Sequence, residues 1–168
     1  MTKKMKINEI PVVHIKLVKD KSLLSDKAIT TPEEAASVIR DLISESDREM
    51  FCVLNLNTKG FAINLNIVSI GTLNEAMAHP REVFKASILS NAAAIMLFHS
   101  HPSGIVEPTN EDKYTTQRLV ECGRLMGIEV IDHIIVGTDK DKYFSFREEE
   151  ILYDVYTKKE KRVAEHER

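Results

Sequence analysis

Residues 98–112 read FHSHPSGIVEPTNED and combine two histidines, a glycine, two prolines, a threonine and an aspartate in one short span. They follow directly on an apolar run over residues 92–98, AAAIMLF. An apolar run of this length that ends in turn residues is typical of a buried strand. The chemically active side chains are therefore expected where a central strand ends and a loop begins, a common place for function in α/β domains.

The spacing of the two histidines suits a metal ion. His99 and His101 are two residues apart, so on extended chain both imidazoles point to one face. Asp112, just inside an expected helix, can add a carboxylate oxygen. Two histidines and one carboxylate leave a fourth position for water, which is the pattern of a catalytic zinc site. Zinc bound there would lower the pKa of that water to about 7.

The same residues also allow a purely structural interpretation. Two nearby histidines often lie on a surface loop, and Thr109 with Asp112 three residues later forms a plausible capping box at a helix start. The types of residue alone leave both interpretations open.

The complete order of the stretch resembles the JAMM signature of MPN/JAB-domain metallopeptidases. That signature runs His, Ser or Thr, His, Pro, six residues, Ser, two residues, Asp. The one departure is Thr109, where the family usually has Ser; a threonine keeps the hydroxyl and adds a methyl group to the pocket.

Further segments resemble the bacterial RadC branch of that superfamily, and the resemblance covers about residues 31–151. In that branch the residue between the two histidines is usually Asn, whereas here it is Ser100. The segments that carry the resemblance are GTLN (71–74), HPREVF (79–84), NAAA (91–94) and DHIIVG (132–137).

The resemblance implies a set of roles. His99, His101 and Asp112 would hold Zn²⁺, and Thr109 would steady the developing oxyanion. The family also needs a carboxylate outside the metal shell as general acid and base, and the matching position is Glu49, at the start of an early strand. The alternative is that Glu49 is a solvated residue at a strand end, with Glu75 and Glu107 as reserve candidates for its role.

Three more polar residues are candidates for a place behind the metal ligands. Ser100 lies between the histidines. Asp132 and His133 lie in an apolar run, where a buried pair can hydrogen-bond toward metal ligands. A satisfied polar pair in the core is the equally simple alternative for Asp132 and His133.

The expected fold is α/β, a mixed β-sheet flanked by helices, which is the MPN/JAB sandwich that is similar to cytidine deaminases. A deaminase would need His-x-Glu followed by Pro-Cys-x-x-Cys, and the chain has neither, so base deamination is disfavoured. The expected strands cover about residues 10–18, 50–56, 61–70, 92–98, 128–136 and 143–146, and the expected helices 32–46, 81–90, 111–126 and the charged stretch from 147.

The expected organisation is an N-terminal arm or edge strand (1–30), the RadC-like domain (31–151) and a charged C-terminal helix or tail (152–168). From its length before residue 31, the chain is expected to lack the N-terminal helix-hairpin-helix segment that RadC proteins usually carry. There is no signal peptide and no long apolar span, so a cytoplasmic protein with no membrane partner is the default.

Charge limits the partners that the chain can bind by itself. With 23 basic and 26 acidic residues the net charge is −3, which carries no polyanion-binding signature. The expected partner is a protein or peptide substrate, with a homodimer left open. The alternative function is an accessory role in DNA repair or recombination, with a non-catalytic metal site and nucleic acid reached only indirectly, through partners.

Overall fold

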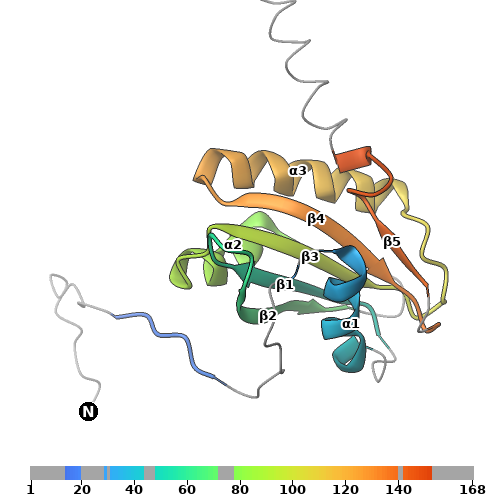
Figure 1. Cartoon of the computed structure of the whole chain (residues 1–168), viewed down its shortest axis with the longest axis horizontal. Coiled ribbons are helices and arrows are strands. Elements are labelled where there is room, and N and C mark those ends of the chain that lie inside the picture. Colours follow the sequence, from blue (N-terminus) through green and yellow to red (C-terminus); the bar gives the residue numbers. More distant parts are fainter. Residues whose placement is uncertain are drawn as a thin grey trace, which may run out of the picture.

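We describe the fold from a computed structural model of the 168-residue chain. The structure describes residues 14–19, 29, 31–43, 48–71, 78–139 and 142–152, apart from the side chains at positions 41 and 43. Along these residues the chain forms three helices and five strands (Figure 1). Their bounds are α1 (Pro32–Ile43), β1 (Met50–Leu56), β2 (Ala62–Ile70), α2 (Pro80–Leu89), β3 (Ala94–Ser100), α3 (Asn110–Met126), β4 (Glu129–Val136) and β5 (Tyr143–Ser145).

The five strands form one mixed sheet in the order β2-β1-β3-β4-β5 (Figure 1). β3 and β4 are parallel, because α3 returns the chain between them, and the other neighbouring strands are antiparallel. The expectation of an α/β fold with a mixed sheet and flanking helices is confirmed.

Two apolar clusters show that helices cover both faces of the sheet. On one face, Val83 and Phe84 of α2 and Leu119 and Val120 of α3 pack on the strands. On the other face, α1 packs through Ala35, Ala36 and Ile39. In β1 every residue is buried, and alternate residues belong to opposite clusters, as a strand between two helical layers requires.

Caps lie where α1 was predicted to begin and where α3 was predicted to end. Thr31 and Glu34 form a capping box before α1, since each backbone N–H donates to the other residue's side chain at 3.2 Å. Gly127 ends α3 in the left-handed region, with φ 68°. β1 and β2 form an antiparallel pair, with β1 over the predicted residues and β2 starting one residue later than predicted.

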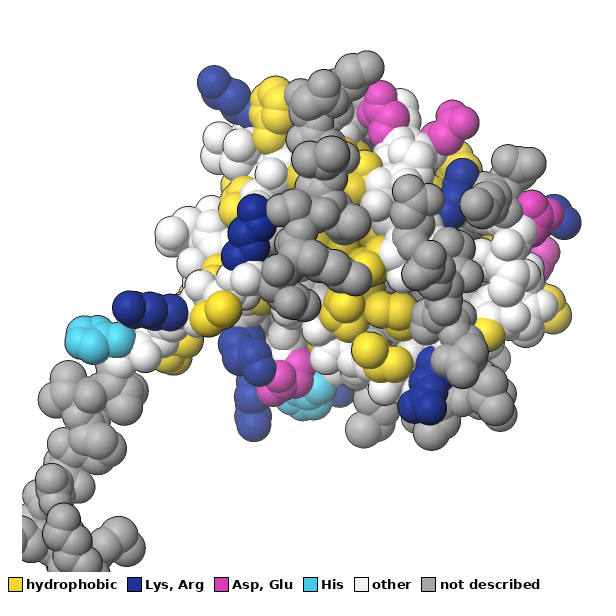
Figure 2. All heavy atoms as spheres, turned by 90° about the horizontal axis from the view of Figure 1, so that it is seen from below, with side chains coloured by type: hydrophobic (Ala, Val, Ile, Leu, Met, Phe, Trp, Pro, Cys, Tyr) yellow, Lys and Arg dark blue, Asp and Glu magenta, His cyan; other side chains and the backbone are white. Residues whose placement is uncertain are grey.

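The expected N-terminal strand is wrong where it can be checked. Residues 14–19 are exposed and form no strand, while 10–13 lie outside the described residues. Figure 2 shows an arm with basic and apolar side chains at the side of the domain. The alternation of residue types was not sufficient, because a strand needs a neighbour to satisfy its backbone groups. The stretches 44–46 and 153–168, where helix was predicted, also lie outside the described residues.

A bulge in β4 changes which side chains face which helices. Ile95 of β3 pairs with Val130, but the next residue, Met96, pairs with Asp132, so β4 has one extra residue at this point. The extra residue reverses the alternation, and His133 therefore lies beside Leu97 in the register, on the face that α2 and α3 cover. No helix among the described residues is long and apolar enough to cross a membrane.

Candidate metal centre

The pairing of β1 with β3 brings Glu49 to the histidines. Phe51 pairs with His99, and β3 continues through Ser100, two residues further than the apolar run. Because alternate residues share a face, Glu49, just before β1, lies on the same face as His99 and His101. Both histidines are buried and Glu49 is half-buried.

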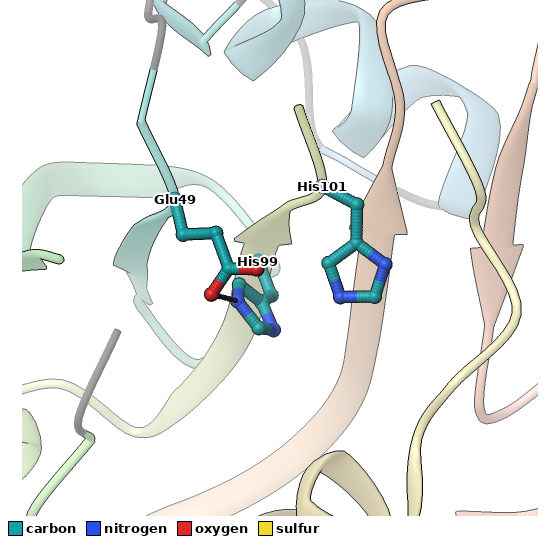
Figure 3. Close-up of side chains that lie close together, drawn as sticks. All are labelled: Glu49, His99 and His101. Atoms are coloured by element: carbon teal, nitrogen blue, oxygen red, sulfur yellow. Dashed lines mark ion pairs between the residues drawn. The ribbon is translucent and has the colours of Figure 1, made fainter. Parts of the chain in front are cut away.

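Three side chains meet in a group that suits a metal ion (Figure 3). Glu49 points at His99, with 3.5 Å between Oε2 and Nε2. One ligand atom from each of Glu49, His99 and His101 lies within 4.8 Å of the other two. A carboxylate and two imidazoles at this separation are a donor set for zinc and for several other divalent ions.

Asp112, in the first turn of α3, lies against both histidines. Its Oδ1 is 2.8 Å from Nδ1 of His99, and its Oδ2 is 3.7 Å from Nε2 of His101. Oδ2 also accepts from the backbone N–H and the hydroxyl of Thr109, at 2.8 and 2.6 Å. The capping box and the arrangement around the histidines therefore use the same residues, so the two interpretations of the sequence do not exclude each other.

The charge state of Asp112 follows from these contacts. Burial acts to raise the pKa of Asp112, but the hydrogen bonds from His99 and Thr109 outweigh it and hold that pKa well below its usual range. Asp112 is therefore a carboxylate at neutral pH, as a metal ligand has to be.

The loop after β3 fixes the ring of His101. Nδ1 of His101 donates to the carbonyl oxygen of Ile105 at 2.6 Å, so Nε2 is the ring nitrogen that can face a cation. The backbone N–H of His101 donates to the carbonyl of Val136 at 2.9 Å. Gly104, with φ 79°, lies directly on Gly137, so the loop is packed against the end of β4.

The residues present fit a metal ion on one direct observation. Nε2 of His99 is buried and has no hydrogen-bond partner. A buried polar atom of this kind is costly unless something satisfies it, and the Asp112 carboxylate on Nδ1 leaves Nε2 free to bind a cation. A divalent ion beside Nε2 of His99 would satisfy it.

The comparisons with known proteins agree with the fold. A protein-family model, described as the RadC-like JAB domain, matches residues 29–151. The chain belongs to this family. The match runs from Ile29, just before α1, to Ile151 and includes all the described strands.

Curated relatives of this RadC-like JAB domain are named as UPF0758 proteins. The one from Rubrobacter xylanophilus is 46% identical over 124 residues, which are 74% of this chain and 53% of the relative. Those from Clostridium acetobutylicum and Staphylococcus carnosus are 45% identical over 124 residues (74% and 53%) and 48% identical over 112 residues (67% and 50%). The chain thus spans about half the length of the curated relatives it matches.

The three residues predicted to lie behind the ligands of the JAB domain differ in their surroundings. Ser100 accepts from the backbone N–H of Met50 at 2.8 Å. Asp132 accepts from Ser145 Oγ at 2.7 Å and from the backbone N–H groups of Arg147 and His133, at 3.0 and 2.7 Å. The Asp132 carboxylate thus joins the bulge of β4 to β5 and to the turn after β5. For Asp132 these contacts match the alternative of a satisfied polar group in the core.

His133 is closer to the site. Its ring lies parallel to that of His99, with 6.4 Å between centroids, and stacks on Phe146. The hydroxyl of Thr116 donates to the backbone carbonyl of Asp112, so Nδ1 of His133 must donate to that hydroxyl; both distances are 2.6 Å. His133 therefore supports the first turn of α3, which carries Asp112.

Sequence reasoning missed Thr116 and Phe51. Thr116 is four residues after Asp112, so helical spacing places it on the same face. Phe51 packs against the rings of His99 and His133, at 5.9 and 5.6 Å. Of the reserve candidates, Glu107 is exposed and Glu75 lies outside the described residues. His79 is the N-cap of α2, where its Nδ1 accepts from the N–H of Arg81.

Proposed function

We propose that this domain is a zinc-dependent hydrolase of the JAMM metallopeptidase type, which cleaves a peptide or isopeptide amide bond. The observation that supports it most directly is the buried Nε2 of His99, which has no hydrogen-bond partner and lies beside the carboxylate of Glu49. Membership of the RadC-like JAB family and the spacing of the motif support the same reaction class.

His99, His101 and Asp112 would hold the metal ion in this proposal. Each histidine has one ring nitrogen held by a neighbour, Nδ1 of His99 by Asp112 and Nδ1 of His101 by Ile105. Both oxygens of Asp112 are held, Oδ1 by His99 and Oδ2 by Thr109, so Asp112 would bind the ion through an oxygen that also accepts a hydrogen bond. Contacts of this kind fix the rings and the carboxylate before a metal binds. A bound divalent ion would supply Lewis-acid chemistry. It would polarise the amide carbonyl and lower the pKa of a bound water molecule toward neutrality.

Glu49 acts as the general acid and base. Its carboxylate takes a proton from the attacking water and gives it to the nitrogen of the leaving amine. Its side chain is half-buried beside His99. Thr109 would donate a hydrogen bond to the oxyanion. Its hydroxyl donates to Asp112 in the structure, so this role requires the hydroxyl to turn.

The substrate is proposed only as a class, a protein or peptide. An accessory role in DNA repair, reached through partners, is supported by no specific side-chain arrangement among the described residues.

Elemental analysis and a labelling experiment test the proposal. The purified protein is offered zinc, dialysed and compared with the His99→Ala/His101→Ala double variant; we expect about one zinc per chain, lost in the variant. The zinc-loaded protein and Glu49→Gln are then incubated with proteome-derived peptides and lysine-linked isopeptides, and new amino groups are labelled. We expect new amines only with Glu49 present. Equal zinc in the double variant, or equal turnover by Glu49→Gln, would contradict the proposal.

A further inference from the structure

Ser100 lies between two metal-binding candidates but faces the other side of the sheet. In β3 alternate side chains point in opposite directions, so Ser100 points away from His99 and His101. It is 4% exposed. The register of β1 and β3 places Ser100 opposite Met50, the residue that follows Glu49.

The side chain of Ser100 holds the backbone on both sides of Glu49. The N–H of Met50 donates to Ser100 Oγ at 2.8 Å. Ser100 Oγ in turn donates to the carbonyl oxygen of Arg48, at a longer 3.4 Å. These two groups belong to the residues that flank Glu49, so one hydroxyl spans the position of the proposed acid and base.

The hydroxyl extends the sheet where the ladder stops. The pairing of β1 with β3 begins at Phe51 and His99, so no backbone pair of these strands includes Glu49. From the opposite side, the N–H of Gly71 donates to the carbonyl of Glu49 at 2.9 Å. The backbone of Glu49 is thus held from β2 and from β3, and its side chain is the part that reaches His99.

We propose that Ser100 is a positioning residue for Glu49, which sets the place of its carboxylate against the metal centre without touching that centre. The inference rests on the proposed function. The reason is geometric: without the hydroxyl, the N–H of Met50 and the carbonyl of Arg48 lose a buried partner, and the segment before β1 is free to move relative to His99.

A double-mutant cycle with Co²⁺ as the probe tests the inference. The proteins are wild type, Ser100→Ala, Glu49→Gln and Ser100→Ala/Glu49→Gln, with Ser100→Thr as the variant that keeps the hydroxyl. The visible absorption of bound Co²⁺ reports the surroundings of the metal. Chelator competition gives the Zn²⁺ affinity, and hydrogen exchange of the Met50 amide, measured without metal, reports the tether itself.

Ser100→Ala is expected to change the Co²⁺ absorption in the same direction as Glu49→Gln, and to change the Zn²⁺ affinity in the same direction as Glu49→Gln and by no more than that variant does. In the Glu49→Gln background the same change should add nothing to either measurement. Ser100→Thr should restore the wild-type absorption, and the Met50 amide should exchange faster only in proteins that carry Ser100→Ala.

Four results would overturn the inference. An equal effect of Ser100→Ala in both backgrounds would mean that the hydroxyl acts on the histidines or on the fold. An unchanged Met50 amide would mean that there is no tether. If the Co²⁺ spectrum of Glu49→Gln differed from wild type and that of Ser100→Ala did not, the positioning role of Ser100 would be excluded, while the proposed role of Glu49 would stand. A wild-type Glu49→Gln spectrum would remove the proposed role of Glu49 and the positioning role with it.

Discussion

Asp112 shows how one side chain at this site serves the fold and the chemistry together. Its Oδ2 closes the capping box with Thr109, and its Oδ1 holds Nδ1 of His99. Any change at Thr109 therefore acts on helix α3 and on the metal centre, and the two effects have to be separated by measurement.

Thr109→Ala removes the hydroxyl that makes two hydrogen bonds in the capping box. Because the N–H of Asp112 loses its acceptor and Oδ2 loses a donor, we expect about 1 kcal/mol less stability, with weaker zinc binding. Urea denaturation and chelator competition measure the two effects. Thr109→Ser keeps the hydroxyl and is the control, so equal losses in both variants would contradict the role given to the cap.

The two cysteines should differ in reactivity. Cys52 is fully buried in β1, and burial raises the pKa of its thiol to about 12, whereas Cys122 on α3 is half-buried. Since the thiolate is the reactive form, a thiol reagent should label Cys122 in the folded protein and Cys52 only after unfolding. Mass spectrometry of wild type and Cys122→Ser checks this, and rapid labelling of folded Cys122→Ser would contradict it.

At the scale of elements, the sequence predicted those features that depend on residues close together in the chain, such as a helix cap and the spacing of the motif. The capping box of Thr109 and Asp112 marked the start of a helix, and the motif marked His99, His101 and Asp112 as neighbours. Contacts that depend on strand register were not predictable. The bulge before Asp132, the bond from Met50 to Ser100 and the link from Thr116 to His133 all depend on how β1, β3, β4 and α3 meet.

The contact of Gly104 with Gly137 joins the loop after β3, which begins with His101, to the end of β4. A Cβ at position 137 would lie 2.8 Å from the carbonyl oxygen of Gly104. We therefore expect Gly137→Ala to displace the loop that carries His101 and to lower both stability, by about 1–3 kcal/mol, and zinc affinity. Chelator competition and urea denaturation again give the two values.

Gly127→Ala is the matched control. Its φ of 68° is unfavourable for alanine, at a cost of about 1–2 kcal/mol, but a Cβ there would meet nothing within 4 Å. It should lower stability and leave zinc affinity unchanged. If the two variants lost zinc affinity equally, the loss would follow general destabilisation and not the position of the loop.

At the scale of the whole molecule, helices on both faces of the sheet leave ionisable groups in a dry interior. His133 is the clearest case. Burial, with a smaller contribution from His99, lowers the pKa of His133 to about 3. In the unfolded chain the same side chain titrates near pH 6.5.

Acid should therefore unfold the metal-free protein partly through His133. Below pH 6.5 the unfolded chain binds a proton that the folded chain does not, so stability falls as the pH falls toward 3, by up to about 1.4 kcal/mol per pH unit. Urea midpoints between pH 7 and 4, measured with a chelator present, check this. His133→Phe should show a shallower dependence, and an unchanged slope would contradict the role of His133.

The pairing of β1 with β3 also bears on the order in which the site forms during folding. His99 and Asp112 are only 13 residues apart, so bringing them together closes a short loop. The bond between Met50 and Ser100 spans 50 residues, and long loops close at a greater entropic cost and more slowly. We therefore expect Glu49 to join the histidines late in folding. Under the proposed function, a folding chain would gather its metal ligands before it had the carboxylate that the cleavage step needs.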